Sequence, residues 1–90
     1  MLTDQVLRIA DSAAELGATL AVLGQHIEAE RLLRQAIAIY EENWGRDDPR
    51  FAGALYALGT TCAARGRLTE AEQFYHRALR TVTTQALESR

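Results

Sequence analysis

The apolar positions of the chain recur every three or four residues in four separate stretches, which is the period of one helix face. The first stripe runs through Val6, Ile9, Ala10, Ala13, Leu16, Gly17, Leu20 and Leu23, and Gly24 ends it. The second stripe runs through Ala29, Leu32, Leu33, Ala36, Ile37, Tyr40 and Trp44, and Gly45 ends it. Since no stretch alternates apolar and polar residues, the sequence predicts helices and no strand.

The third and fourth helices begin at recognisable start signals. The side chain of Asp48 can cap the third helix, and Pro49 fits its first turn, where no hydrogen-bond donor is lost. Thr69 and Glu72 have the spacing of a capping box, which predicts the start of the fourth helix, and we expect that helix to end near Glu88. Loops of two to five residues make consecutive helices antiparallel, so the chain is expected to be all-α with four helices.

Residues 13–40 and 55–82 are nearly the same sequence, displaced by 42 positions, as in Leu16 and Leu58 or Gly17 and Gly59. Self-similarity at one fixed period indicates repeats that bury their apolar faces by stacking on one another. We therefore expect a single domain over residues 1–90, with repeat one at about 4–44, a linker at 45–48 and repeat two at about 49–88. The two glycines should let the helices of each repeat approach closely, opposite the small side chains of Ala29 and Ala71.

Composition and charge restrict the classes of partner. With 48% hydrophobic and 24% charged residues, the 90-residue chain belongs to the globular class. A net charge of -2 with both signs mixed offers no basic stripe for nucleic acid and no polybasic patch for a membrane. A single cysteine cannot form an internal disulfide, and no long apolar segment or signal segment opens the chain. The expected location is therefore cytoplasmic.

The repeated pattern resembles the tetratricopeptide repeat. It is carried by Leu58, Gly59, Gly66, Ala71, Tyr75 and Ala78, and it is echoed by Leu16, Gly17, Gly24, Ala29, Leu33 and Ala36. The period of 42 residues and the connecting segment from Trp44 to Pro49 are similar to the kinesin-light-chain-like variety. The resemblance implies two helical hairpins in a short right-handed α-solenoid that binds proteins and performs no catalysis.

The resemblance also implies a concave groove lined by the first helix of each repeat. The corresponding positions here are Asp11, Ala14, Ala18, Ala21, Gly53, Tyr56, Thr60 and Ala63. Members that clamp a peptide carboxylate carry Lys and Asn in this groove, whereas this chain has mostly Ala and Thr, so a carboxylate clamp is not expected. A helix or an extended peptide of a partner protein suits the groove better, with Tyr56 as its anchor. The alternative is that these alanines reflect helix propensity alone.

Chemistry-bearing residues form no catalytic or metal-binding pattern in the sequence. Cys62 falls on an apolar stripe, where cysteine behaves as a small hydrophobe. His26 and His76 are isolated from each other and from other ligand residues, and no phosphate-binding or nucleophile motif is present. We therefore expect no enzyme activity, no metal and no cofactor.

Self-association is the second functional hypothesis. Because only two repeats are present, both ends of the stack should expose apolar surface. Candidate residues are Val6 and Ile9 at one end, with Phe74, Val82 and Leu87 at the other, meeting their counterparts in a symmetric homodimer.

Overall fold

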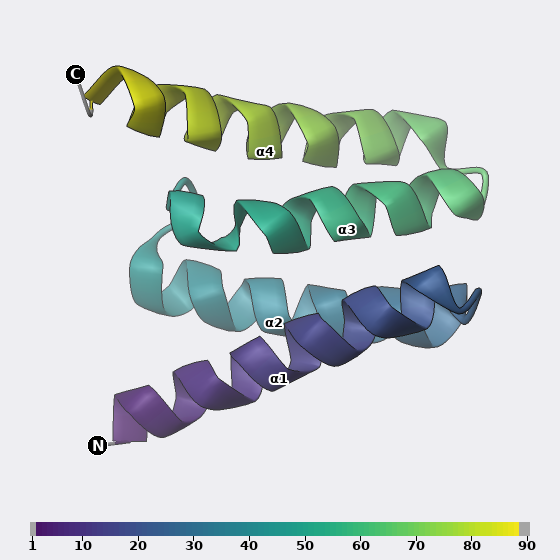
Figure 1. The fold of residues 1–90 in the computed structure, drawn as a ribbon, viewed down its shortest axis with the longest axis horizontal. Coiled ribbons are helices and arrows are strands. Elements are labelled where there is room, and N and C mark those ends of the chain that lie inside the picture. Colours follow the sequence, from purple (N-terminus) through teal and green to yellow (C-terminus); the bar gives the residue numbers. More distant parts are fainter. Residues whose placement is uncertain (1, 89–90) are drawn as a thin grey trace.

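The computed structural model describes residues 2–88, apart from the side chain of Gln85. Its elements are α1 (Leu2–Val22), α2 (His26–Trp44), the short 3-10 helix η1 (Pro49–Phe51), α3 (Ala52–Ala64) and α4 (Leu68–Glu88). The helices lie side by side in chain order, and no strand occurs within the described residues (Figure 1). The predicted all-α fold of four helices is confirmed.

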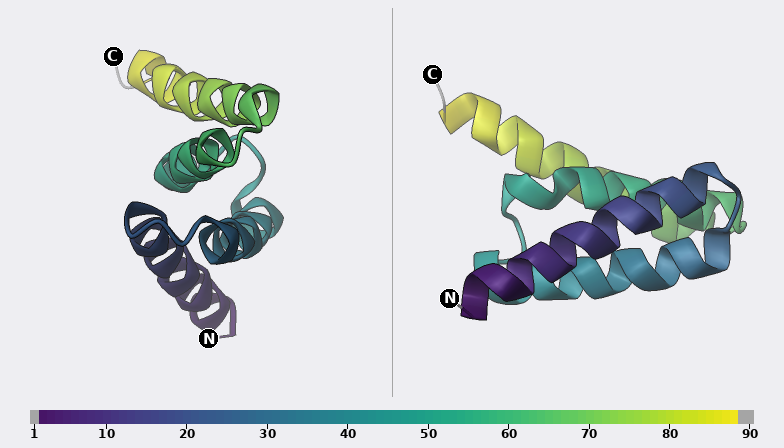
Figure 2. Two further views of the ribbon diagram at one scale, coloured as in Figure 1. Left: turned by 90° about the vertical axis from the view of Figure 1, so that its right-hand side faces the viewer. Right: turned by 60° about the horizontal axis from the view of Figure 1, so that its bottom comes forward.

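The helices form two hairpins, α1 with α2 and α3 with α4, which we call repeat one and repeat two. Contacts between the hairpins are made mainly by α2 and α3. The left view of Figure 2 looks along the helices and shows α1 and α3 on the same side of the stack. These two helices therefore share one face of the molecule.

Both hairpin turns close in the same way, 42 residues apart. Gly24 and Gly66 have positive φ angles of 87° and 82°, a backbone conformation that favours glycine. After each glycine the chain folds back, so that the N–H of Gln25 donates to the Leu20 carbonyl at 2.8 Å and that of Arg67 donates to the Cys62 carbonyl at 2.9 Å. This six-to-one bond is the hydrogen bond of a Schellman motif, and it fixes where each first helix ends.

The helix starts differ in part from the prediction. Asp48 caps as expected, because its Oδ1 accepts from the N–H of Arg50 at 2.9 Å, but the first turn after it is a 3-10 turn. The prediction that Thr69 caps the fourth helix is wrong. The N–H of Ala71 donates to the carbonyl of Arg67 at 3.0 Å, so helical bonding begins at Arg67 and leaves Thr69 inside the first turn.

A continuous core joins the repeats. Its largest members are Leu33, Ile37 and Tyr40 from repeat one, with Phe51, Leu55, Leu58 and Cys62 from repeat two. The rings of Tyr40 and Phe51 stack with centroids 5.4 Å apart, which links α2 directly to the start of repeat two. The thiol of Cys62 is buried in this core as predicted, and burial raises its pKa.

Two glycines inside the helices receive large side chains from the partner helix. A Cβ added to Gly17 would lie 2.9 Å from Cγ of Leu33, and one added to Gly59 would lie 2.7 Å from Cε1 of Tyr75. The predicted close approach is confirmed, with the carbonyl oxygens of Ala29 and Ala71 as the next backbone neighbours. Leu33 and Tyr75 therefore fill notches that only glycine leaves open.

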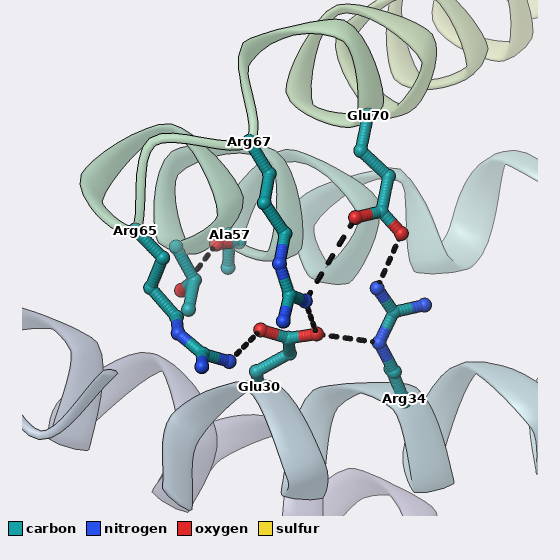
Figure 3. Close-up of polar contacts among 7 residues, drawn as sticks. Glu30, Arg34, Ala57, Arg65, Arg67 and Glu70 are labelled. Atoms are coloured by element: carbon teal, nitrogen blue, oxygen red, sulfur yellow. Dashed lines mark hydrogen bonds and ion pairs between the residues drawn. The ribbon is translucent and has the colours of Figure 1, made fainter. Parts of the chain in front are cut away.

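An ionic cluster holds the repeats together on another side (Figure 3). The buried carboxylate of Glu30 on α2 accepts hydrogen bonds from Arg34 at 2.9 Å, Arg65 at 2.6 Å and Arg67 at 2.7 Å. Arg34 also donates to Glu70 on α4 at 2.7 Å. Burial raises the pKa of Glu30, but the bonds and charges of the arginines outweigh it and hold that pKa below its ordinary value. We call this group the Glu30 clasp.

Candidate functional site

The face shared by α1 and α3 contains a hollow of about 270 Å³ between the two repeats. Four of the predicted groove residues line it, Ala18 and Ala21 from α1 with Tyr56 and Thr60 from α3. Ala18, Ala21 and Thr60 have small side chains, which leaves this space open beside the ring of Tyr56. We call it the central hollow.

A smaller hollow of about 200 Å³ continues along the same face and brings together Asp11, Ala14 and Gly53. Here the carboxylate of Asp11 accepts a hydrogen bond from the hydroxyl of Tyr40 at 2.6 Å. Asp11 is therefore engaged with α2, and it positions a core tyrosine as well as lining the groove. Burial, followed by the bond to Asp11, raises the pKa of Tyr40.

Tyr56 is the large exposed aromatic residue of the face, with 59% of its surface accessible. Its ring rests against the ring of Tyr75 with centroids 5.5 Å apart, which restricts the orientations that it can adopt. The same tyrosine borders the central hollow and a third, larger depression between α3 and α4. A side chain that is exposed and held in place loses little entropy when a partner covers it.

The polar groups of the groove are largely satisfied within the molecule. Thr60 donates its hydroxyl hydrogen to the carbonyl of Ala57 at 2.8 Å. At the edge of the smaller hollow, Arg50 is bonded to Asp48 at 2.9 Å, and its guanidinium lies over the Trp44 ring at 3.9 Å from the centroid. The groove therefore presents mainly apolar surface. Ala63 is half-buried, one turn beyond Thr60.

His26 is a groove residue that the sequence analysis did not select. It lines the central hollow together with Tyr56, and its buried Nδ1 has no hydrogen-bond partner among the described residues. The 42-residue spacing was a usable signal, since Leu68 occupies the equivalent position in repeat two and a histidine there breaks the apolar pattern. His26 therefore adds a polar side chain to the lining of the hollow, although its Nδ1 is buried.

The neighbouring helices cover only part of the apolar stripes of α1 and α4. Ala10 and Gly17 are buried, whereas Ile9, Leu16 and Leu23 are exposed on the adjacent side of α1. The reason is geometric, because α1 has helices on one flank alone and its stripe is wider than that contact. Leu79 on α4 is exposed for the same reason.

The self-association candidates are not all on equivalent surfaces. Ile9, Val82 and Leu87 are exposed, and Val6 is half-buried. Phe74 instead packs against the core, with Arg34 5.6 Å above its ring on the side of α4 that faces α2. The structure therefore does not place Phe74 with Val82 on the outer surface of repeat two.

Within residues 2–88, no group of three or more His, Cys, Asp or Glu residues is arranged to hold a metal ion. In the same range, no helix combines the length and apolar character needed to cross a membrane.

Comparison with known proteins agrees with this geometry. The family model of the tetratricopeptide repeat matches residues 8–84, a range that covers all four helices except the start of α1 and the end of α4. Neither the curated proteins nor the solved structures gave a significant match. Repeated hairpins, glycine notches at one fixed spacing and the family match lead to one conclusion: the chain belongs to the tetratricopeptide repeat family.

Proposed function

We propose that this chain is a non-catalytic protein-interaction module that binds a helix or an extended segment of a partner protein on the α1 and α3 face. The observation that supports it most is Tyr56, an exposed aromatic side chain held by Tyr75 at the border of the central hollow. Aromatic residues contribute much of the energy of protein interfaces. Membership of a family that mediates protein interactions supports the same function.

The partner segment should be apolar or aromatic where it meets the central hollow. Ala18, Ala21 and Tyr56 supply apolar surface, and Asp11 is already bonded to Tyr40. Without a lysine in the chain, a peptide carboxylate has no ammonium group to bind in this groove.

The proposal is tested with peptides selected from a displayed random library on the immobilised chain, followed by calorimetric titration. Tyr56→Ala should weaken the best peptide by about thirtyfold, the effect of removing an interface hot spot. Gln35→Ala, an exposed position on α2, is the matched control and should leave the affinity unchanged. Equal affinities of the Tyr56 variant and the wild type for the peptide would show that the peptide does not bind at this groove.

Self-association is a second candidate function, supported by the large apolar side chains that are exposed at both ends of the stack, Leu2, Ile9, Leu16, Leu79 and Val82. Exposed apolar patches of this kind are typical of protein interfaces. Sedimentation velocity over a wide concentration range tests it, because a self-associating chain sediments faster as its concentration rises. A constant monomer mass at millimolar concentration would exclude this candidate.

We also propose the extent of the module, its location and its class of partner. Residues 1–90 act as a single module of two repeats, whose 42-residue period and connecting segment are similar to the kinesin-light-chain-like variety. The module works in the cytoplasm, and its partners are proteins and not nucleic acids or membranes, in keeping with its net charge of -2. No cofactor takes part.

A further inference from the structure

The contact between the two repeats has two complementary halves. Repeat one contributes Ile37 and Tyr40 from α2, which we call the rear face of a repeat. Repeat two contributes Phe51 and Leu58 from η1 and α3, which we call the front face. All four side chains are almost completely buried where the faces meet. The molecule therefore shows directly how a front face fits a rear face.

The 42-residue spacing places a second copy of each half on the outside of the molecule. On the front face of repeat one, Ile9 replaces Phe51 and is 62% exposed, compared with 2% for Phe51. Leu16, the equivalent of Leu58, is 52% exposed, compared with 1%. On the rear face of repeat two, Leu79 is 65% exposed and its equivalent Ile37 only 5%. One chain thus carries one uncovered front face and one uncovered rear face.

The uncovered rear face of repeat two contains a groove. A groove of about 680 Å³ lies between α3 and α4, and it is bordered by Gly53, Tyr75, Leu79 and Val82. At the equivalent place in repeat one, the ring of Phe51 stacks on Tyr40. Val82 stands where repeat one has Tyr40, and Gly53 where it has Asp11, so the side chains at these two positions of the groove are smaller and uncharged.

The uncovered front face is a regular apolar seam along α1. Its members are spaced alternately by four and three residues, the pattern of a helix that packs lengthwise on another helix. They are Leu2, Val6, Ile9, Ala13, Leu16, Leu20 and Leu23. This seam has the chemistry of the α3 surface that already occupies the rear face of repeat one.

We propose that the front face of one copy of this chain docks on the rear face of a second copy, head to tail. In this arrangement Ile9 enters the groove beside Leu79 and Val82, as Phe51 meets Tyr40 within the chain. The interface is heterologous, because it joins two different faces. An assembly of any length therefore keeps a free front face at one end and a free rear face at the other, and it does not stop at a dimer. The inference rests on the self-association candidate above, and its groove shares Gly53 and Tyr56 with the α1 and α3 face.

The joint between copies lacks the Glu30 clasp, which makes it weaker than the joint within the chain. Glu72 is the equivalent of Glu30, but Leu23 and Gln25 stand where repeat two has Arg65 and Arg67. Ion pairs to a buried carboxylate therefore do not form across the proposed contact. The assembly should be reversible and should grow with concentration.

Blocking one face at a time gives the first test. Leu16→Glu places a charge on the front face and Leu79→Glu on the rear face, both at exposed positions where the helix tolerates glutamate. Each variant alone should sediment as a monomer, and an equimolar mixture should form a one-to-one dimer through the single intact pair of faces. Gln35→Glu on α2 is the matched control and should assemble as the wild type does. Circular dichroism checks that each variant keeps its helices.

Restoring the missing clasp gives the second test. The double variant Leu23→Arg with Gln25→Arg supplies the arginines found at the equivalent positions of repeat two, where the backbone accepts them. In a head-to-tail contact they meet Glu72 of the neighbouring copy and should tighten association about tenfold at low salt. Adding Glu72→Gln should abolish that gain.

The outcomes separate the competing arrangements. A rear-face variant that stays dimeric while the front-face variant is monomeric would establish a symmetric contact through α1, and would overturn the head-to-tail arrangement while leaving self-association intact. Weaker association of the double arginine variant would also overturn it, since the added charges would then face each other. A wild-type chain that remains monomeric at millimolar concentration would overturn both this inference and the self-association candidate.

Discussion

The carboxylate of Glu30 in repeat one accepts a hydrogen bond from the guanidinium of Arg65 in repeat two at 2.6 Å. Their side chains are 35 positions apart in sequence, and the contact crosses the boundary between the repeats. Only 6% of the Glu30 surface is exposed, so its charge depends on the three arginines around it. The Glu30 clasp therefore links the order of one repeat to the presence of the other.

Removing the charge of Glu30 should destabilise the stack. Glu30→Gln leaves three arginines with a weaker acceptor, and the partial exposure of the arginines limits the expected loss to about 2 kcal/mol of unfolding free energy at pH 7. Urea denaturation followed by circular dichroism measures the loss. Glu42→Gln, an exposed position on α2, is the control and should change stability by less than about 0.5 kcal/mol.

The contribution of Glu30 should also disappear in acid. Its pKa in the folded protein is below the ordinary value of 4.5, so the stabilisation is fully present above that value and is lost as the pH falls through the folded pKa. The stability difference between wild type and Glu30→Gln should therefore be constant from pH 7 to about pH 5 and should shrink below it. A difference that stays constant down to pH 2 would show that the carboxylate charge does not stabilise the fold.

The glycine notch at Gly59 should not tolerate a methyl group. Gly59→Ala gains about 1 kcal/mol of helix propensity but forces the ring of Tyr75 away, and we expect a net loss of about 1–2 kcal/mol. Gly53→Ala is the control on the same helix, because a Cβ there meets no atom within 4 Å. That variant should be as stable as the wild type or slightly more so. Thermal unfolding distinguishes them, and a stabilised Gly59→Ala would contradict the packing described above.

Phe51 should be the side chain on which the joint between repeats depends most. It is 2% exposed and stacks on Tyr40, so Phe51→Ala should cost about 3–5 kcal/mol. Tyr56→Ala removes an aromatic ring of similar size from an exposed position and should cost less than about 1 kcal/mol. Equal losses for the two variants would contradict the different burial of these rings. Denaturant titration of both variants gives the comparison.

The bond between Asp11 and Tyr40 should be visible in a titration of the phenol. Burial and the hydrogen bond to Asp11 both raise the pKa of Tyr40, so the neutral phenol stabilises the fold at neutral pH and that stability is lost as the pH rises above 10. In a chain with Tyr56→Phe and Tyr75→Phe, absorbance at 295 nm follows Tyr40 alone. Adding Asp11→Asn should lower the midpoint of the titration, and an unchanged midpoint would show that Asp11 does not act on the phenol.

Much of the fold was predictable from the sequence because local signals agreed with the repeat. The glycines at Gly24 and Gly66 fixed both hairpin turns, and Asp48 fixed the start of repeat two. The start of α4 was not predictable in this way, since a backbone bond from Ala71 to Arg67 begins the helix before the Thr69 capping signal.

The site was less predictable than the fold, for a physical reason. Spacing along a helix shows which residues share a face, and in the structure Ala18, Ala21, Tyr56 and Thr60 line one hollow. Which part of a wide apolar stripe is covered depends on the neighbouring helices, so the exposure of Leu16 and the packing of half-buried Phe74 against the core required the structure. Asp11 meets Tyr40 on α2, and Glu30 meets Arg65 and Arg67 at the turn between α3 and α4, so these bonds left no signal in local sequence.

The proposed binding face can be mapped directly by the methyl signals of alanine in a nuclear magnetic resonance titration with a library-selected peptide. Ala14, Ala18 and Ala21 of α1 lie on the face, and Ala38 is exposed on α2. Peptide binding should shift the three α1 methyl signals and leave that of Ala38 in place. Shifts at Ala38 with none at the three α1 methyl groups would contradict binding on the α1 and α3 face.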